Sequence, residues 1–179
     1  FTQAKQKKNL MDFSDMEHYA IALLVIPAGH GYTPTLLAKS ISQLYDEVMI
    51  DEFQDTNEAQ EMIFRAVSNH EKNLFMVGDV KQSIYRFRQA MPELFMEKKK
   101  HYMSYNGHDF PAKIILGKNF RSAYEITEGI NFLFSLLMSD KIGEINYNEE
   151  ESLIAGTAFP SGKQRGCMID LLDISDYAG

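Results

Sequence analysis

Short apolar runs that alternate with segments of helical spacing constrain the fold of this chain more than any other feature. Residues 48–50 and 74–77 are such runs, and each ends abruptly in acidic or glycine residues. A short continuous apolar run with this ending is typical of a buried strand in a parallel sheet. The segments between the runs carry apolar residues three and four positions apart, as helices do. We therefore predict an α/β protein with a mainly parallel sheet flanked by helices, whose ligands lie beyond the carboxyl ends of the strands.

Caps and breakers give approximate limits for the predicted elements. Ser14 with Glu17 and Ser122 with Glu125 fit the capping-box pattern at a helix start. Pro27 is expected to stop the first helix and to lead into a loop over 29–33. The expected elements are helices over about 15–26, 34–45, 58–69, 92–102 and 122–137, strands over 48–50, 74–77, 114–116 and 168–174, and an aperiodic connection over 140–165.

The composition excludes a disordered, fibrous or membrane-spanning chain. Its 179 residues, 45% hydrophobic and 24% charged, suffice for one domain or two incomplete ones. The most apolar window, 21–27, is too short to cross a bilayer, and Cys167 has no second cysteine to pair with, which favours a reducing, cytoplasmic location. The first residue is Phe1 rather than Met, so we expect an internal piece of a longer protein.

The charges are distributed unevenly along the chain. Residues 78–121 contain nine Lys or Arg and four Asp or Glu, a net charge of +5, whereas the whole chain has −7 and the remainder therefore −12. A basic segment in an acidic protein is typical of a local site for phosphates. A solvated helix face, for example one that includes Lys98, Lys99 and Lys100, would give the same count, so both interpretations stay open.

Two adjacent carboxylates, Asp51 and Glu52, follow the first predicted strand. Adjacent residues at a strand end point in different directions, so one carboxylate could hold a hydrated Mg²⁺ while the other faces a water molecule. Phosphoryl transfer needs this division of labour. A solvated turn after a strand would show the same two residues, so the pair alone does not decide the function.

The next two strand ends add amides, cations and aromatic rings. Aromatic residues interleaved with Arg, as over 82–88, suit stacking on unpaired bases and contact with their phosphates, although rings packed in a core would leave the same pattern. Residues 119–121, Asn-Phe-Arg, precede a predicted helix start, where an arginine can reach a phosphate.

Together, three segments resemble motifs II, III and IV of the superfamily 1 DNA helicases of the UvrD/Rep group: DEFQDTN at 51–57, VGDVKQSIYRFR at 77–88 and GKNFRS at 117–122. Their order and spacing match as well. Within that group, the stretch from 77 to 95 looks most like AddA, the helicase/nuclease component of bacterial AddAB recombination complexes. DFSDMEHYAIALL at 12–24 fits the segment that precedes motif II, and the resemblance covers about 12–138.

The resemblance implies a segment of an ATP-dependent DNA helicase that binds ATP and Mg²⁺ between two P-loop (RecA-like) lobes. Asp51 would ligate Mg²⁺, Glu52 would activate water, and Gln82 would sense the γ-phosphate. Arg121 would act as an arginine finger, and Phe120 would stack on adenine. Tyr85, Phe87 and Arg88 would face single-stranded DNA, with Phe87 at a position where many relatives carry Trp.

The resemblance also implies how the chain is divided and what it lacks. Residues 1–109 would form part of the first lobe, 110–139 the start of the second, and 140–179 a connection and a further strand. The chain contains no GxxxxGK[ST] phosphate loop, so by itself it is expected to be inactive. The family implies single- and double-stranded DNA as substrates, AddB as the partner protein, an exonuclease in another domain, and a role in double-strand break repair and recombination. An exposed sheet edge could pair with a second copy as a dimer.

Two other functions fit the same residues less closely. A non-hydrolysing DNA-binding or interaction module would keep the fold but lose the water-activating carboxylate, and Glu52 is present. A different Mg²⁺-dependent nuclease would need more clustered carboxylates than the sequence offers.

Overall fold

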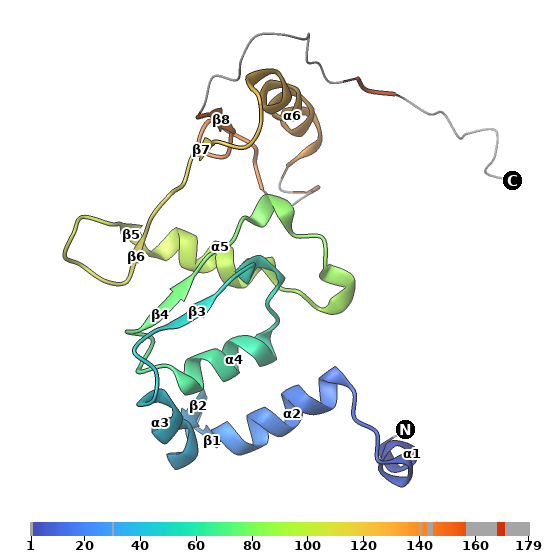
Figure 1. Ribbon diagram of the computed structural model, residues 1–179, viewed down its shortest axis with the longest axis vertical. Coiled ribbons are helices and arrows are strands. Elements are labelled where there is room, and N and C mark those ends of the chain that lie inside the picture. Colours follow the sequence, from blue (N-terminus) through green and yellow to red (C-terminus); the bar gives the residue numbers. More distant parts are fainter. Residues whose placement is uncertain (1, 30, 140, 143–144, 157–167, 171–179) are drawn as a thin grey trace, which may run out of the picture. The chain divides into compact units, whose positions relative to one another are not determined.

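The structure, a computed structural model, describes residues 2–29, 31–139, 141–142, 145–156 and 168–170, except for the side chains of Thr2 and Arg88. It divides into two compact units, residues 1–114 and residues 115–179. Helices and small sheets alternate along the chain (Figure 1). Of the four two-stranded sheets in the described part, three are parallel, which is consistent with the predicted α/β class. Among the described residues, no helix is both long and apolar enough to span a membrane.

The first unit begins with helices α1 (Thr2–Lys8) and α2 (Phe13–Leu24), followed by a hairpin of β1 (Val25–Ala28) and β2 (Gly31–Pro34) and by α3 (Leu36–Ser42). The strands pair antiparallel from Val25 opposite Pro34 to Ala28 opposite Gly31. The predicted stop at Pro27 and the predicted loop over 29–33 are therefore wrong. The chain leaves the helix at Val25, and a two-stranded hairpin tolerates Pro27 because every strand in it is an edge strand.

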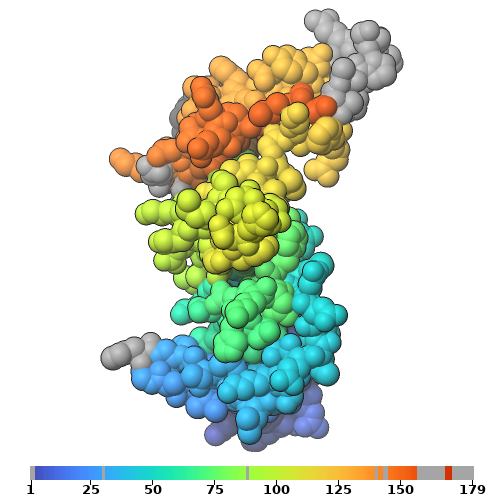
Figure 2. All heavy atoms as spheres, turned by 90° about the vertical axis from the view of Figure 1, so that its left-hand side faces the viewer, coloured from blue at the N-terminus to red at the C-terminus, as the bar shows by residue number. Residues whose placement is uncertain are grey.

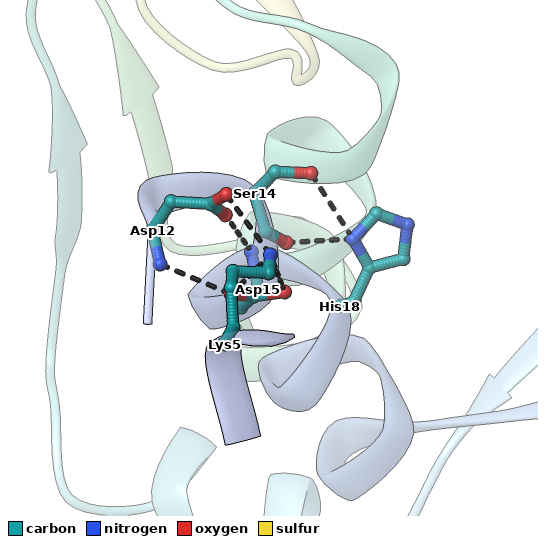
Figure 3. Close-up of polar contacts among 5 residues, drawn as sticks. All are labelled: Lys5, Asp12, Ser14, Asp15 and His18. Atoms are coloured by element: carbon teal, nitrogen blue, oxygen red, sulfur yellow. Dashed lines mark hydrogen bonds and ion pairs between the residues drawn. The ribbon is translucent and has the colours of Figure 1, made fainter. Parts of the chain in front are cut away.

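The start of α2 also differs from the sequence prediction (Figure 3). Asp12 is the N-cap: its carboxylate accepts from the Asp15 backbone N–H at 2.9 Å, and the Asp15 carboxylate accepts from the Asp12 N–H at 3.0 Å. The Lys5 ammonium lies 2.9 Å from the Asp12 carboxylate and 2.6 Å from that of Asp15. The capping box predicted at Ser14 is therefore wrong, because the same pattern two residues earlier has an additional cationic partner.

The centre of the first unit is a parallel pair of strands, β3 (Val48–Ile50) and β4 (Leu74–Met76), with Val48 opposite Leu74 and Ile50 opposite Met76. Helix α4 (Glu58–Val67) lies on one side of this pair and α5 (Pro92–His101) on the other (Figure 1). The predicted start of α4 is confirmed, because Asn57 and Gln60 form a capping box. Short 3-10 turns follow the strands, η1 (Phe53–Asp55), η2 (Val80–Gln82) and η3 (Arg86–Arg88), and β5 (Met103–Ser104) pairs in parallel with β6 (Ala112–Lys113).

The hydrophobic core of the first unit lies among α2, α3, α4 and the start of the hairpin. Its buried residues are Leu24, Val25, Ala38 and Ala66, and half-buried apolar side chains of the same elements surround them. Figure 2 shows the atoms of this unit in successive layers, from the blue of α2 through the green around α4 to the yellow-green of α5. Through this core, α4 packs against α2, α3 and the hairpin.

The second unit contains β7 (Lys118–Asn119), α6 (Tyr124–Leu137) and β8 (Ile154–Ala155), and β7 and β8 are parallel. The strand predicted over 114–116 is wrong: the strands lie on either side of it, and Leu116 is 85% exposed. The capping box predicted at Ser122 is also wrong, because the N-cap of α6 is Ala123 without a side-chain hydrogen bond. Of the strand predicted over 168–174, residues 168–170 are not in a strand and the rest lie outside the described residues.

Within the stretch predicted as a connection, residues 145–156 pack against α6. The side-chain amide of Asn131 donates to the Leu153 carbonyl at 3.0 Å, and its oxygen accepts from the Leu153 N–H at 2.9 Å and from the Tyr147 hydroxyl at 2.7 Å. One asparagine of α6 therefore holds the segment that delivers β8 to β7.

Candidate functional site

The carboxyl ends of β3 and β4 bring two of the predicted motifs together in the first unit. Beyond the last paired residues, the Val77 N–H donates to the Ile50 carbonyl and the Phe53 N–H donates to the Val77 carbonyl, both at 2.9 Å. These bonds continue the ladder past the strands. As a result, the segments that begin at Asp51 and at Gly78 leave the sheet at the same edge, as predicted for parallel strands.

Asp51 and Glu52 are both exposed at this edge. The Asp51 carboxylate accepts from the Glu52 N–H at 3.0 Å. Glu52 has φ 51° and ψ 43°, the left-handed region, which costs a non-glycine residue about 1–2 kcal/mol. This residue turns the chain out of the strand and into η1. The two adjacent carboxylates are therefore both exposed at the point where the backbone turns out of the strand.

The side chain of Gln54 forms hydrogen bonds with residues at both strand ends. Gln54 is 1% exposed. The Nε2 group donates to Glu52 Oε2 at 2.6 Å, and Oε1 accepts from the Asp79 backbone N–H at 3.0 Å. Sequence reasoning did not select Gln54, because only the pairing of β3 with β4 shows that its amide reaches the second motif.

Asp79 organises the second motif. Its carboxylate accepts from the Lys81 ammonium at 2.9 Å, from the Lys81 N–H at 3.1 Å and from the Gln82 side-chain amide at 3.1 Å. Burial by itself raises the pKa of Asp79, but the hydrogen bonds and charge of Lys81, together with the bond from Gln82, outweigh it and leave that pKa below its usual value. Asp79 therefore holds the predicted γ-phosphate sensor, Gln82, beside the first motif.

A buried layer supports this edge of the sheet. Phe53 is fully buried and packs edge-to-face on Phe95 of α5, with 5.7 Å between ring centroids. The Lys98 ammonium lies 5.9 Å from the Phe53 ring centroid and 2.9 Å from the Glu61 carboxylate, and both charged side chains are 14% exposed. Lys98 therefore belongs neither to a solvated face nor to a phosphate site, because it is paired beneath the turn that follows β3.

The segment predicted to face DNA follows the second motif. The Phe87 ring is 77% exposed and lies 5.8 Å, centroid to centroid, from the half-buried Tyr85 ring. Exposure of this size contradicts the interpretation of Phe87 as a core residue. The Met91 N–H donates to the Thr56 carbonyl at 2.9 Å, which ties the end of the segment back to the first motif. The side chain of Arg88, the third predicted DNA contact, lies outside the described part of the structure.

The third motif lies in the second unit, where Asn119 ends β7. Its side-chain oxygen accepts from the N–H groups of Arg121 and Ser122, both at 2.9 Å, and so forms the turn that leads to α6. Arg121 is exposed and Phe120 is 65% exposed. A Cβ on Gly156 would lie 2.7 Å from atoms of the Phe120 ring, so this glycine leaves room for the ring.

The residues predicted for the nucleotide site therefore fall into two groups. Glu52 and Gln82 are linked in the first unit through Gln54 and Asp79, and Asp51 precedes Glu52 at the same strand end. Phe120 and Arg121 share one turn of the second unit. Among the residues that the structure describes, no group of three or more His, Cys, Asp or Glu forms a metal site. A single exposed carboxylate nevertheless fits Mg²⁺, which keeps several waters and uses one or two protein carboxylates together with substrate phosphates.

Comparisons with known proteins place the sequence of this chain in a helicase family. The family model of the UvrD/REP helicase N-terminal domain matches residues 1–103, and the chain belongs to that family. Its relatives include proteins named as the A subunit of an ATP-dependent helicase/nuclease. That of Bacillus pumilus is 46% identical over 168 residues, which cover 91% of this chain and 14% of the relative. That of Bacillus licheniformis is 48% identical over 164 residues, which cover 89% of this chain and 13% of the relative. The chain thus spans only a small part of the length of these curated relatives.

Proposed function

We propose that these residues form part of the ATP-hydrolysing motor of an AddA-type helicase/nuclease that moves along DNA. The observation that carries the proposal is the strand-end arrangement of the first unit, where the exposed Glu52 is linked to Gln82 through Gln54 and Asp79, next to the exposed carboxylate of Asp51. The family and the names of the relatives support ATP as substrate. In this proposal residues 1–109 belong to a first P-loop (RecA-like) lobe, residues 110–139 begin a second lobe, and residues 140–179 lead on from it.

Each site residue has one proposed role in hydrolysis. Asp51 offers a carboxylate to Mg²⁺, which when bound neutralises phosphate oxygens. Glu52 orients the attacking water and accepts its proton, and Gln82 contacts the γ-phosphate. Arg121 stabilises the charge that develops on the transferred phosphoryl group, and Phe120 stacks on the adenine ring.

Single-stranded DNA is the proposed polymer ligand, bound by Tyr85, Phe87 and Arg88. The exposed Phe87 ring next to Tyr85 offers an aromatic surface on which any base can stack. We further propose that the full-length protein works with an AddB-type partner in DNA repair and recombination, because the relatives are named as one subunit of a helicase/nuclease. An exonuclease activity would reside elsewhere in such a protein.

The decisive experiment measures DNA-stimulated ATP hydrolysis by a full-length AddA-type protein that carries these residues. Glu52→Gln keeps the size of the side chain but removes its charge, so kcat should fall by about 10² to 10⁴ while ATP binding persists. The matched control is Glu58→Gln, another exposed glutamate, at the start of α4, which should leave kcat unchanged. ATP hydrolysis that survives Glu52→Gln would instead indicate a non-hydrolysing module contaminated by another ATPase.

A further inference from the structure

Gln54 is a buried amide whose hydrogen bonds both point at the proposed hydrolysis site. One donor reaches the Glu52 carboxylate at 2.6 Å, and the carbonyl oxygen accepts from the Asp79 N–H at 3.0 Å. A hydrogen bond to an ionised carboxylate is about twice as strong as one between neutral groups. With 1% of the residue exposed, water cannot replace either bond without rearrangement of the turn. The amide is therefore fixed, and it fixes one oxygen of an otherwise exposed carboxylate.

Gly78 shows how closely the two strand ends approach each other around this amide. A Cβ at position 78 would lie 2.6 Å from Gln54 Oε1, 3.2 Å from the Phe53 nitrogen and 3.2 Å from a ring carbon of Phe95. Real Cβ atoms do not approach other atoms to 2.6 Å, so any larger residue at position 78 would displace the amide or the backbone. The Gln54 amide thus occupies the space that a side chain at position 78 would need.

The contact continues to the second motif. Asp79, whose N–H is held by Gln54, uses its carboxylate to accept from the Gln82 side-chain amide at 3.1 Å. One hydrogen-bonded path therefore runs from Glu52 through Gln54 and the Asp79 residue to Gln82. Glu52 and Gln82 at its two ends are exposed, Asp79 is half-buried, and Gln54 is buried.

We propose that Gln54 is a positioning residue, which holds the Glu52 carboxylate in the orientation that activates water and keeps it in register with Gln82. The proposal rests on the function proposed above, in which Glu52 is the water-activating base. Gln54 does not touch ATP in this scheme and acts through Glu52. Its loss should therefore reduce the rate of hydrolysis much more than the binding of ATP.

The test compares three variants of the full-length AddA-type protein in DNA-stimulated ATP hydrolysis. Gln54→Met fills the same space without either hydrogen bond, and Gly78→Ala disturbs the same amide from the other strand end. The matched control is Ser68→Ala, because Ser68 is also buried, at 4% exposed, and also makes two hydrogen bonds, donating to the Arg65 carbonyl and accepting from the Glu71 N–H. Each variant is measured for kcat, KM for ATP and affinity for single-stranded DNA, with Glu52→Gln as reference.

We expect Gln54→Met and Gly78→Ala to lower kcat by about tenfold to hundredfold, with KM for ATP and DNA affinity within about threefold of wild type. Ser68→Ala should leave all three values within about twofold. Added to Glu52→Gln, Gln54→Met should lower the residual single-turnover rate by less than about twofold, because the two residues act as one unit.

The outcomes separate this proposal from the function on which it rests. If Glu52→Gln abolishes hydrolysis but Gln54→Met retains the wild-type kcat, the positioning role is overturned and the proposed function stands. If Gln54→Met loses ATP binding together with kcat, Gln54 has only a structural role and the proposal is again overturned. If Glu52→Gln itself leaves hydrolysis intact, the proposed function fails, and the role of Gln54 fails with it.

Discussion

The two proposed halves of the nucleotide site are built in opposite ways. In the first unit, hydrogen bonds join the strand-end residues. The Glu52 carboxylate accepts from the Gln54 amide and the Asp79 carboxylate from the Gln82 amide, and Gln54, which joins the two ends, is buried. In the second unit, a single asparagine, Asn119, shapes the turn through backbone N–H groups, and Arg121 extends into solvent. The side chains of the first half are preorganised by their own hydrogen bonds, whereas the second half offers the exposed guanidinium of Arg121.

This difference matches the chemistry proposed for each half. A base that orients one water molecule must be held in a narrow range of positions, and buried hydrogen bonds provide that. A cation that stabilises charge on a phosphoryl group acts over a longer range and needs a clear path to the ligand. The comparison therefore predicts that substitutions in the second half lower the rate of ATP hydrolysis and leave the stability of the fold unchanged. Substitutions in the first half should change both the rate and the stability.

The largest effect is expected from Arg121→Ala in the full-length protein. An arginine finger contributes about 10³ to 10⁵ in rate where it has been isolated, so kcat should fall by that order while thermal unfolding stays unchanged. Lys141→Ala removes an exposed cation from the same unit and serves as the control. A turnover number within a few-fold of wild type for Arg121→Ala would contradict the assignment of Arg121 to the nucleotide site.

A smaller effect is expected from Phe87→Ala. Stacking of a base on an aromatic ring contributes about 1–3 kcal/mol, so affinity for single-stranded DNA should weaken by about tenfold or more, and Phe87→Trp should bind as well as wild type or better. Because the ring is 77% exposed, its truncation leaves no core cavity. Affinity and thermal unfolding should be measured on one sample: unaltered affinity, or a collapsed unfolding transition, contradicts the stacking role.

The buried layer beneath the first half can be tested with Lys98→Met. This change leaves the Glu61 carboxylate, whose side chain is 14% exposed, without its partner at 2.9 Å, and should cost about 1–2 kcal/mol of stability. Faster amide hydrogen exchange in α4 and α5 would show the loss. Lys100→Met, at an exposed position on the same helix, is the control. Equal exchange in the two variants would mean that the ion pair does not support the site.

The smallest effect concerns Asp55, which has one buried carboxylate oxygen without a hydrogen-bond partner. Burial, and then the charge of Glu52, raise the pKa of Asp55 above its usual value, so ionisation of Asp55 disfavours the folded state as pH rises. Asp55→Asn should therefore raise the unfolding temperature near neutral pH by a few degrees, equivalent to less than about 1 kcal/mol. The gain should vanish at acidic pH, below the unfolded-state pKa of about 3.9, where Asp55 is neutral in both states.

Asp79 should have the opposite effect on the pH dependence of stability, and it therefore tests the same reasoning. Its pKa lies below the usual value, so its ionised form stabilises the folded state at pH values above the unfolded-state pKa. That stabilisation is lost as pH falls through the folded-state pKa. Asp79→Asn should therefore lower the unfolding temperature near neutral pH and lose its effect in acid. A higher unfolding temperature for both variants would contradict the assignment of Asp79, and a lower one for both would contradict that of Asp55.

Local patterns in the sequence predicted much of the first unit and its site. The strands at 48–50 and 74–76, the cap at Asn57 and the placement of Asp51 and Glu52 at a strand end follow from residues that are neighbours in the chain. Gln54 could not be selected in this way, because its partner Asp79 is 25 residues away and only strand pairing brings the two together. The ion pair of Lys98 could not be predicted from the run of three lysines for the same reason, since its partner Glu61 lies on another helix.

The errors also have physical causes. The pattern of Ser14 and Glu17 is a valid helix start, but the contacts of Lys5 with two aspartates favour a start two residues earlier. Residues 114–116 are apolar enough for a buried strand, yet Ile114 and Leu116 are 65% and 85% exposed, so the premise of burial fails there. In the first case a contact from another helix decided between two local patterns, and in the second the apolar run was not buried.

The close approach of Gly78 to Gln54 has a consequence for the exchange of segments between relatives. A chimaera that takes residues 77–88 from one protein and residues 51–57 from another must match the space at position 78 to the side chain at position 54, since a Cβ there would come within 2.6 Å of the amide oxygen. The two motifs are separate in the sequence but form a single transplantable module, and grafts that divide it should fold less well than grafts that move it whole.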